Sequence, residues 1–218
     1  MSEKKRVLCY GDSLTWGWVP VESTAPTTRY PWERRWTGAM AAALGGQAEI
    51  VEEGLSGRTT NADDPTDPRL NGAAHLPAAL ATHLPLDLVV IMLGTNDTKV
   101  YFGRTPFEIA AGASTLVAQV AGCAGGVGTV YPAPPVLLVS PPPLGEIPDP
   151  WFAELFQGGR EKTRELPRHY RALASFLGVS FADAGRHVAT EGVDGIHFTA
   201  ENNLALGTAL AQEVAALL

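Results

Sequence analysis

Asp87-Leu88-Val89-Val90-Ile91-Met92-Leu93, followed at once by Gly94-Thr95-Asn96-Asp97, is the stretch that decides the fold. An uninterrupted apolar run from Leu88 to Leu93 is typical of a central parallel strand that is covered on both faces. Polar residues directly after such a strand lie at the carboxyl edge of the sheet, where open α/β sheets bind ligands. This stretch therefore predicts an α/β fold and marks one edge of its sheet as a candidate site.

Short apolar runs and longer helical patterns alternate on both sides of this stretch, as in βαβ units around a mostly parallel sheet. We predict strands at residues 7–10, 49–53, 87–93, 136–140 and 180–182, and helices at residues 32–44, 73–83, 106–122, 154–177 and 199–218. Helix ends are expected at Gly45, Gly122 and Gly178, and a helix start at Thr105 before Pro106. Residues Thr199 and Asn202 match a capping box only in part. Longer loops are expected at 19–30, 61–72 and 141–150, and such loops often carry functional residues.

The charge balance excludes several classes of partner. The 218 residues include 16 Lys and Arg against 23 Asp and Glu, a formal net charge of −7. A broad basic surface for nucleic acid or an anionic membrane is therefore not expected. No apolar run reaches the roughly 18 residues that mark a membrane span, and the run at 7–10 is too short for a signal-peptide core. We expect a soluble, cytoplasmic protein.

The sequence gives no sign of a metal or a cofactor. Cys9 and Cys123 lie far apart, without a Cys or His spacing typical of zinc or redox sites. The acidic loop that contains Asp63, Asp64 and Asp67 is interrupted by prolines and lacks a glycine-centred calcium loop, so a turn is the better interpretation. Neither the P-loop pattern nor the G-x-G-x-x-G dinucleotide pattern occurs. We therefore expect neither a metal nor a cofactor.

Four blocks place chemistry-bearing residues beside predicted strand ends or before the last helix. They are Gly11-Asp12-Ser13-Leu14, Gly54-Leu55-Ser56-Gly57, Gly94-Thr95-Asn96-Asp97 and Asp194-Gly195-Ile196-His197. Taken alone, Ser13 is as consistent with a helix N-cap as with a nucleophile. Acyl transfer by serine needs a base, an acidic group that orients the base, and donors for the developing oxyanion. The four blocks together offer one of each.

Five histidines compete for the role of base. His83 lies at a helix end, and His169 and His187 lie in polar segments, so structural or solvated roles are favoured for these three. His75 follows the 61–72 loop and is a minor candidate for a pocket. The three-residue spacing after Asp194 favours His197 as the base.

Together these blocks resemble the GDSL, or SGNH, hydrolase family, and they occur in the family's order along almost the whole chain. The strings Gly-Asp-Ser-Leu-Thr-Trp-Gly-Trp, from residue 11, and Gly-Thr-Asn-Asp-Thr, from residue 94, are closest to its bacterial arylesterase and acyltransferase branch. The resemblance implies that Ser13 is the nucleophile, His197 the general base and Asp194 its orienting acid. It also implies an oxyanion hole made by the backbone N–H groups of Ser13 and Gly57 and the side-chain amide of Asn96. The Gly-x-Ser-x-Gly elbow of the α/β-hydrolase family is absent.

The substrate pocket is the least specified part of the prediction. Trp16, close after Ser13, is the first candidate for a pocket wall, and Ile196, Phe152 and Phe156 are further candidates. Asp12 is also counted among the pocket residues because it is adjacent to Ser13. Strand-to-turn geometry points its side chain away from Ser13, and we interpret it as a hydrogen-bond acceptor that fixes the loop. A pocket closed by Trp16 would favour small acyl groups.

The sequence therefore predicts one domain over residues 1–218, a flavodoxin-like three-layer α/β/α sandwich with a mostly parallel five-stranded sheet. The expected activity is hydrolysis of small acyl and aryl esters through an acyl-serine, with acyl transfer to alcohols or peroxide. The partners are then a small-molecule ester and an alcohol or water acceptor. A carbohydrate or lipid deacetylase and a non-catalytic small-molecule binding module remain alternatives. The resemblance also implies a homo-oligomer, with loops 19–30 and 141–156 as candidate subunit contacts.

Overall fold

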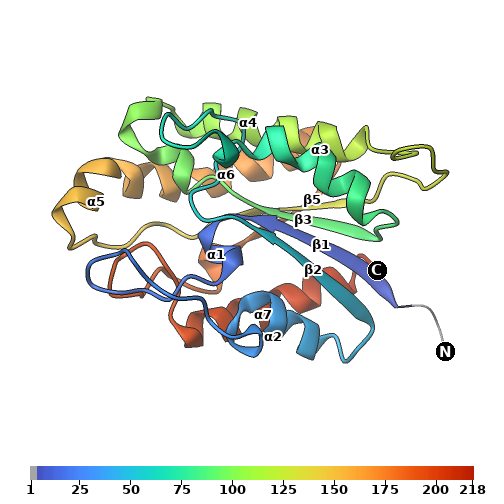
Figure 1. Cartoon of the computed structure of the whole chain (residues 1–218), viewed down its shortest axis with the longest axis horizontal. Coiled ribbons are helices and arrows are strands. Elements are labelled where there is room, and N and C mark those ends of the chain that lie inside the picture. The colour runs from blue at the N-terminus through green and yellow to red at the C-terminus, as the bar shows by residue number, and fades with distance from the viewer. Residues whose placement is uncertain (1–3) are drawn as a thin grey trace.

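The structure, a computed structural model, describes residues 4–218 and contains one five-stranded sheet (Figure 1). Its strands are β1 (Lys5–Gly11), β2 (Ala48–Gly54), β3 (Leu88–Met92), β4 (Val136–Ser140) and β5 (Ser180–Asp183). All neighbouring strands pair in parallel, in the order β2-β1-β3-β4-β5. This is the flavodoxin-like order, in which the chain reverses its direction of growth between β1 and β3. The predicted fold class is confirmed, and the sheet is parallel throughout.

Helices cover both faces of the sheet, as Figure 1 shows. One face carries α2 (Trp36–Ala43) and α7 (Ala200–Ala215), and the other carries α3 (Gly72–His83), α4 (Pro106–Ala121) and α6 (Gly159–Leu177). Alternate residues of β1 serve the two cores: Val7 and Cys9 pack with Trp36 on the α2 side, and Leu8 and Tyr10 pack on the α3 side. Both cores are apolar and buried, so the sheet is held as a rigid platform.

Two predicted helices are interrupted in the structure. The segment predicted as one helix at 154–177 contains the end of α5 (Pro150–Leu155) and the whole of α6, separated at Gly158, whose φ of +73° is left-handed. The segment at 32–44 begins with a 3₁₀ turn, Trp32–Arg34, and Arg35 is extended before α2 starts. Gly158 and Arg35 stop helical hydrogen bonding locally, and periodicity does not detect such single-residue breaks.

The predicted helix caps are present in the structure, and one of them is more complete than predicted. Thr105 caps α4 with Pro106 in the first turn, and Glu108 completes a capping box. The partial match at Thr199 is a full capping box with Asn202 at the start of α7. This cap fixes the helix that immediately follows the Asp194–His197 block.

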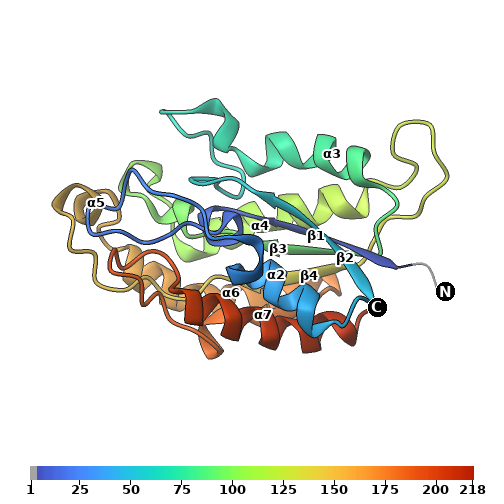
Figure 2. The same cartoon turned by 60° about the horizontal axis from the view of Figure 1, so that its bottom comes forward.

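Several connections meet at the carboxyl end of the sheet. The short helix α1 (Ser13–Trp16) follows β1, and two 3₁₀ turns, η3 (Asn96–Thr98) and η4 (Val100–Phe102), follow β3. Figure 2 shows that the loop after α1, helix α5 and the loop before α7 gather at this same end. Within residues 4–218, no helix is both long and apolar enough to cross a bilayer.

Candidate active site

Ser13, His197 and Asp194 form a continuous hydrogen-bonded chain. The Nε2 atom of His197 lies 2.9 Å from the Oγ atom of Ser13, and its Nδ1 atom lies 2.8 Å from the Oδ2 atom of Asp194. Asp194 is fully buried, and Ser13 and His197 are only 6% and 5% exposed. A serine, a base and an orienting carboxylate in this order are the groups that serine acyl transfer requires.

The turn that carries Asp194 and His197 is held by its own backbone. The Oδ1 atom of Asp194 accepts hydrogen bonds from the N–H groups of Ile196 and His197, both at 2.9 Å. Gly195 has a φ of +70°, and a Cβ there would lie 1.9 Å from the carbonyl oxygen of Glu146. Only glycine fits this position, so the glycine of Asp-Gly-Ile-His is required by the turn.

Asp194 is held in its charged form. Burial raises the pKa of its carboxyl, but the hydrogen bond and charge of His197 and the two backbone N–H groups outweigh burial and lower it below the usual range. An ionised Asp194 accepts from Nδ1 of His197, which leaves Nε2 free to accept the proton of Ser13. The electrostatics therefore favour His197 as a base toward Ser13.

Ser13, Gly57 and Asn96, the residues expected to donate to an oxyanion, line one cavity. Among residues 4–218, the backbone N–H groups of Ser13 and Gly57 have no protein acceptor. Gly57 has a φ of +88°, and a Cβ there would meet the side chain of Leu70 at 3.1 Å. The amide nitrogen of Asn96 donates to Oδ2 of Asp12 at 3.3 Å and to the carbonyl oxygen of Arg58 at 3.2 Å. These two bonds are longer than the usual 2.9–3.0 Å, so a substrate oxygen could compete for the same N–H groups.

Asp12 supports the site from behind. Its side chain is buried, caps α1 by accepting from the N–H group of Leu14 at 2.9 Å, and accepts from Asn96. It does not line the cavity described below, so its place among the pocket residues is corrected and the structural role expected from turn geometry holds. Burial, together with the charge of Asp97, raises the pKa of Asp12 to about 7, although the Leu14 N–H group and Arg58 act in the opposite direction.

The raised pKa of Asp12 predicts a pH-dependent stability. From the usual aspartate pKa up to about 7, the native state keeps a proton on Asp12 that the unfolded chain has released, so this carboxyl stabilises the fold less as pH rises through that window. The slope reaches at most about 1.4 kcal/mol per pH unit. Asparagine does not titrate, so Asp12→Asn lacks this pH-dependent contribution. In urea unfolding, the free energy of unfolding of wild type should therefore fall relative to that of the variant between about pH 4 and pH 7. If the free energies of unfolding of wild type and variant changed with pH in parallel, the raised pKa of Asp12 would be wrong.

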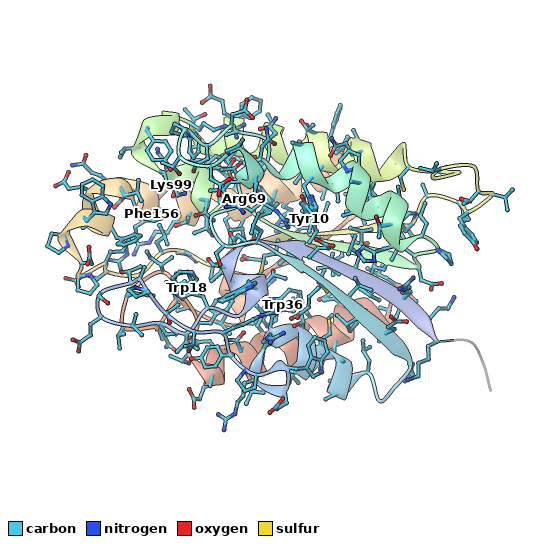
Figure 3. The ribbon with its side chains drawn as sticks, in the orientation of Figure 1. Tyr10, Trp18, Trp36, Arg69, Lys99 and Phe156 are labelled. Atoms are coloured by element: carbon cyan, nitrogen blue, oxygen red, sulfur yellow. The ribbon has the colours of Figure 1, made fainter. Side chains whose placement is uncertain are left out.

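Ser13 and His197 line a cavity of about 350 Å³. Its apolar lining comes from Trp18, Phe152, Leu155, Phe156 and Ile196, and its polar lining from Ser13, Thr24, Ser56, Gly57, Asn96, Lys99 and His197. In Figure 3, Lys99 and Phe156 lie toward the α4 and α5 side of this end of the sheet, and Trp18 lies toward the α2 side. The structure brings the pocket candidates Phe152 and Ile196 to this cavity.

Trp18, rather than Trp16, forms the tryptophan wall. The Trp18 ring stacks on the His197 ring with centroids 5.1 Å apart and an interplanar angle of 18°. Helix α1 is a single turn that ends at Trp16, and Gly17, with a φ of +90°, redirects the chain so that the next side chain faces His197. The Trp16 ring lies against Arg29 and is absent from the cavity lining. The same sequence string contains both tryptophans, and only the conformation of Gly17 distinguishes them.

The remaining candidates from the sequence lie elsewhere. His75 and His83 both contact the carboxylate of Glu53, at 3.2 and 3.0 Å, and none of the four alternative histidines lines the cavity. Asp64 accepts from the backbone and hydroxyl of Thr66, which makes the predicted turn. In the described part of the chain, no group of three or more His, Cys, Asp or Glu side chains is arranged to hold a metal ion.

Lys99, Thr24 and Leu155 line the cavity and are absent from the sequence prediction. Phe156, a candidate from the sequence together with Phe152, also lines the cavity, follows directly on α5 and packs with Ile196. Thr24 is buried at a φ of +59°, and its hydroxyl has no hydrogen-bond partner within residues 4–218. No local pattern in the sequence distinguishes Thr24 or Lys99 from other loop residues.

This fold and the comparisons with known proteins define the class: a carboxylic ester hydrolase on a three-layer α/β scaffold. The chain belongs to the GDSL-like lipase/acylhydrolase family, whose family model matches residues 9–203. Among curated proteins, no sequence matches this chain.

Several solved structures are similar over nearly the whole chain. The native aryl esterase of M. smegmatis is 66% identical, with a TM-score of 0.97, and the match covers 98% of this chain and 100% of that one. Est24, a carbohydrate acetylesterase from Sinorhizobium meliloti, is 64% identical, with a TM-score of 0.98 and coverages of 99% and 100%. A putative arylesterase from Agrobacterium tumefaciens str. C58 is 40% identical, with a TM-score of 0.85 and coverages of 98% and 100%.

Proposed function

We propose that this protein is a serine esterase that cleaves small acyl and aryl esters through an acyl-serine on Ser13. The observation that carries the proposal is the unbroken hydrogen-bonded chain from Asp194 through His197 to Ser13, which opens into a mostly apolar cavity. The similarity to an aryl esterase at 66% identity supports the same substrate class. The oxyanion donors and the pocket residues belong to this proposal as well.

In the first half of the reaction, the Oγ atom of Ser13 attacks the ester carbonyl carbon, and Nε2 of His197 takes the hydroxyl proton. The carbonyl oxygen becomes an oxyanion and accepts hydrogen bonds from the backbone N–H groups of Ser13 and Gly57 and from the amide of Asn96. Collapse of this intermediate breaks the ester bond, and the alcohol leaves with the proton held by His197. The ionised Asp194 stabilises the imidazolium that exists between these steps.

In the second half, His197 takes a proton from the acceptor, and the acceptor oxygen attacks the acyl-serine. Water gives the free acid, an alcohol gives a new ester and peroxide gives a peracid. The apolar walls supplied by Trp18, Phe152 and Ile196 favour an organic alcohol over water in the space beside Ser13. This supports the acyl transfer predicted from the sequence.

A burst assay tests the proposal. Mixing the protein with excess p-nitrophenyl acetate should release one equivalent of p-nitrophenol quickly, before a slower steady rate, and mass spectrometry should place one acetyl group on Ser13. Added benzyl alcohol should divert the acyl group to benzyl acetate. A linear release of p-nitrophenol with no acetylated Ser13 would refute the acyl-serine, and acetic acid as the sole product would refute acyl transfer.

Carbohydrate deacetylation is a second candidate, which the 64% identity with a carbohydrate acetylesterase favours. Both candidates share the acyl-serine and differ in the alcohol that leaves. Acetylated monosaccharides compared with phenyl acetate in the same assay separate them. A higher kcat/KM for the sugar esters would favour the second candidate.

We expect small acyl groups to be preferred. The aromatic side chains of Trp18, Phe152 and Phe156 enclose the cavity around Ser13, and a long chain must displace them or remain in water. Among p-nitrophenyl acetate, butyrate and octanoate, kcat/KM should be lowest for octanoate. A preference for octanoate would contradict this.

The homo-oligomer predicted from the sequence remains part of the proposal. Trp151, inside the candidate contact segment 141–156, is 78% exposed, and Tyr101 and Val100 are each 43% exposed. Apolar surface of this kind supports association. Size-exclusion chromatography with light scattering tests it, and a species of 23.0 kDa would refute it. The cytoplasmic location also stays a prediction.

A further inference from the structure

Lys99 places a positive charge in the wall of the cavity. It lies between η3 and η4, three residues after Asn96, and its side chain is only 9% exposed. Among the described residues, it is the one Lys, Arg, Asp or Glu side chain in the lining that Ser13 and His197 share. A cation in an otherwise largely apolar cavity requires an explanation that the ester chemistry does not supply.

The ammonium of Lys99 is fixed by the acidic loop 61–72. Its Nζ atom lies 3.2 Å from Oδ2 of Asp64, whose side chain is completely buried. The same oxygen accepts from the Tyr101 hydroxyl at 2.8 Å, and Oδ1 of Asp64 accepts from Thr66. Although burial raises the pKa of Asp64, the hydrogen bonds from Thr66 and Tyr101 and the charge of Lys99 lower it to about 2. Asp64 is therefore ionised at neutral pH and holds the lysine in place.

This arrangement leaves N–H groups of Lys99 without a hydrogen-bond acceptor among residues 4–218, although the ammonium also lies 5.8 Å from the centroid of the Tyr101 ring. An ammonium group has three N–H bonds, and within residues 4–218 only Asp64 accepts one from Lys99. The other two have no protein acceptor beside an apolar space. Replacing water at such donors by a hydrocarbon group costs free energy, whereas an oxygen atom on the substrate satisfies them.

The charge balance favours a neutral oxygen over an anion. The carboxylate of Asp64 already compensates the charge of Lys99, so a second anion would be drawn to the ammonium and repelled by Asp64. An ether or hydroxyl oxygen accepts the free N–H bonds without that repulsion. The geometry therefore fits an uncharged polar group of the substrate.

We propose that Lys99 is a specificity-determining residue that selects esters with a neutral ether or hydroxyl oxygen over equally large hydrocarbon esters. The proposal rests on the ester hydrolysis proposed above, because Lys99 acts on a substrate bound at Ser13. The selecting oxygen belongs either to the acyl chain or to the alcohol, and the test below has one arm for each.

The test uses pairs of esters in which one methylene group is replaced by oxygen. The acyl arm compares p-nitrophenyl methoxyacetate with p-nitrophenyl butyrate, and the alcohol arm compares 2-methoxyethyl acetate with butyl acetate. For each arm, the oxygen-to-methylene ratio of kcat/KM is measured for wild type and for Lys99→Met, which cancels the intrinsic reactivity of the esters. In one arm, the ratio should be about tenfold or more higher in wild type, as expected for a hydrogen bond to a charged group.

Two further variants test whether a change in selectivity comes from Lys99 itself. Lys99→Met leaves Asp64 buried without its partner, so Lys99→Met combined with Asp64→Asn removes both charges and should show the same loss of selectivity. Lys162→Met is the matched control, because Lys162 contacts the carbonyl oxygen of Thr98 nearby but does not line the cavity. Its oxygen-to-methylene ratios should equal those of wild type.

The outcomes separate this proposal from the proposed function. If wild type forms no acyl-serine from p-nitrophenyl acetate, the esterase itself fails. If the acyl-serine forms but the ratios of wild type and the double variant agree within about twofold in both arms, only the Lys99 proposal is overturned. A wild-type preference for the anionic p-nitrophenyl hemisuccinate over the methoxyacetate, lost in Lys99→Met, would overturn the selection of a neutral group.

Discussion

Ser13→Ala should lower kcat for p-nitrophenyl acetate by about 10⁴-fold to 10⁶-fold and abolish the burst. The hydroxyl of Ser13 is the atom that His197 contacts at 2.9 Å, and alanine leaves the base with no nucleophile to activate. The backbone N–H group of residue 13 remains, so binding and the oxyanion donors survive. KM should therefore change little, and stopped-flow measurement at 400 nm, where p-nitrophenolate absorbs, would record the loss of the burst.

The control for this variant is Ser114→Ala on α4, whose hydroxyl donates to the carbonyl oxygen of Ala111. It should retain the burst and the steady rate. Unchanged thermal unfolding of Ser13→Ala would show that the loss is chemical. If Ser13→Ala instead kept the activity of wild type, the acyl-serine on Ser13 would be wrong, and another group would have to cleave the ester.

Asp194→Asn should lower kcat by about 10⁴-fold while KM stays close to that of wild type. The asparagine Oδ1 can still accept from the N–H groups of Ile196 and His197, so the turn keeps its shape. Its amide group, however, donates toward Nδ1 of His197, which places the imidazole proton on Nε2. A histidine in that tautomer cannot accept the proton of Ser13, so the nucleophile is present but not activated.

Asp67→Asn provides the same chemical change in the exposed part of loop 61–72, where Asp67 pairs with Arg69. Its kcat should equal that of wild type. Steady-state kinetics with phenyl acetate over a range of pH measures both variants. A fall of less than about tenfold in Asp194→Asn would show that Asp194 is not the group that orients His197.

The sequence predicted the parts of this protein that depend on local order. The strand at Leu88–Met92 was identifiable because a fully buried parallel strand has no polar face. The sequence places Ser13, Gly57 and Asn96 near one another because each comes shortly after a strand, and parallel strands bring their carboxyl ends to one edge. His197 was identifiable because its partner Asp194 lies in the same turn.

The parts that the sequence did not predict depend on single backbone conformations or on distant partners. The break between α5 and α6 is made by the left-handed conformation of Gly158, and the choice between Trp16 and Trp18 by that of Gly17. Lys99 becomes distinctive only through Asp64, 35 positions away, which folding brings to it. The predicted turn at Asp64 was correct, but its contact with the cavity wall is a tertiary property.

The separation of Ser13 and His197 by 184 positions has a practical consequence. The exposed loop that includes Val127 and Val130 lies between β3 and β4, at the opposite end of the sheet from α5 (Figure 1). A chain divided there would place the nucleophile and the oxyanion donors in one fragment and the base with its acid in the other. Neither fragment would hold a complete site, so release of p-nitrophenolate from a p-nitrophenyl ester would show that the two fragments had associated. The arrangement suits a split-enzyme reporter of protein association.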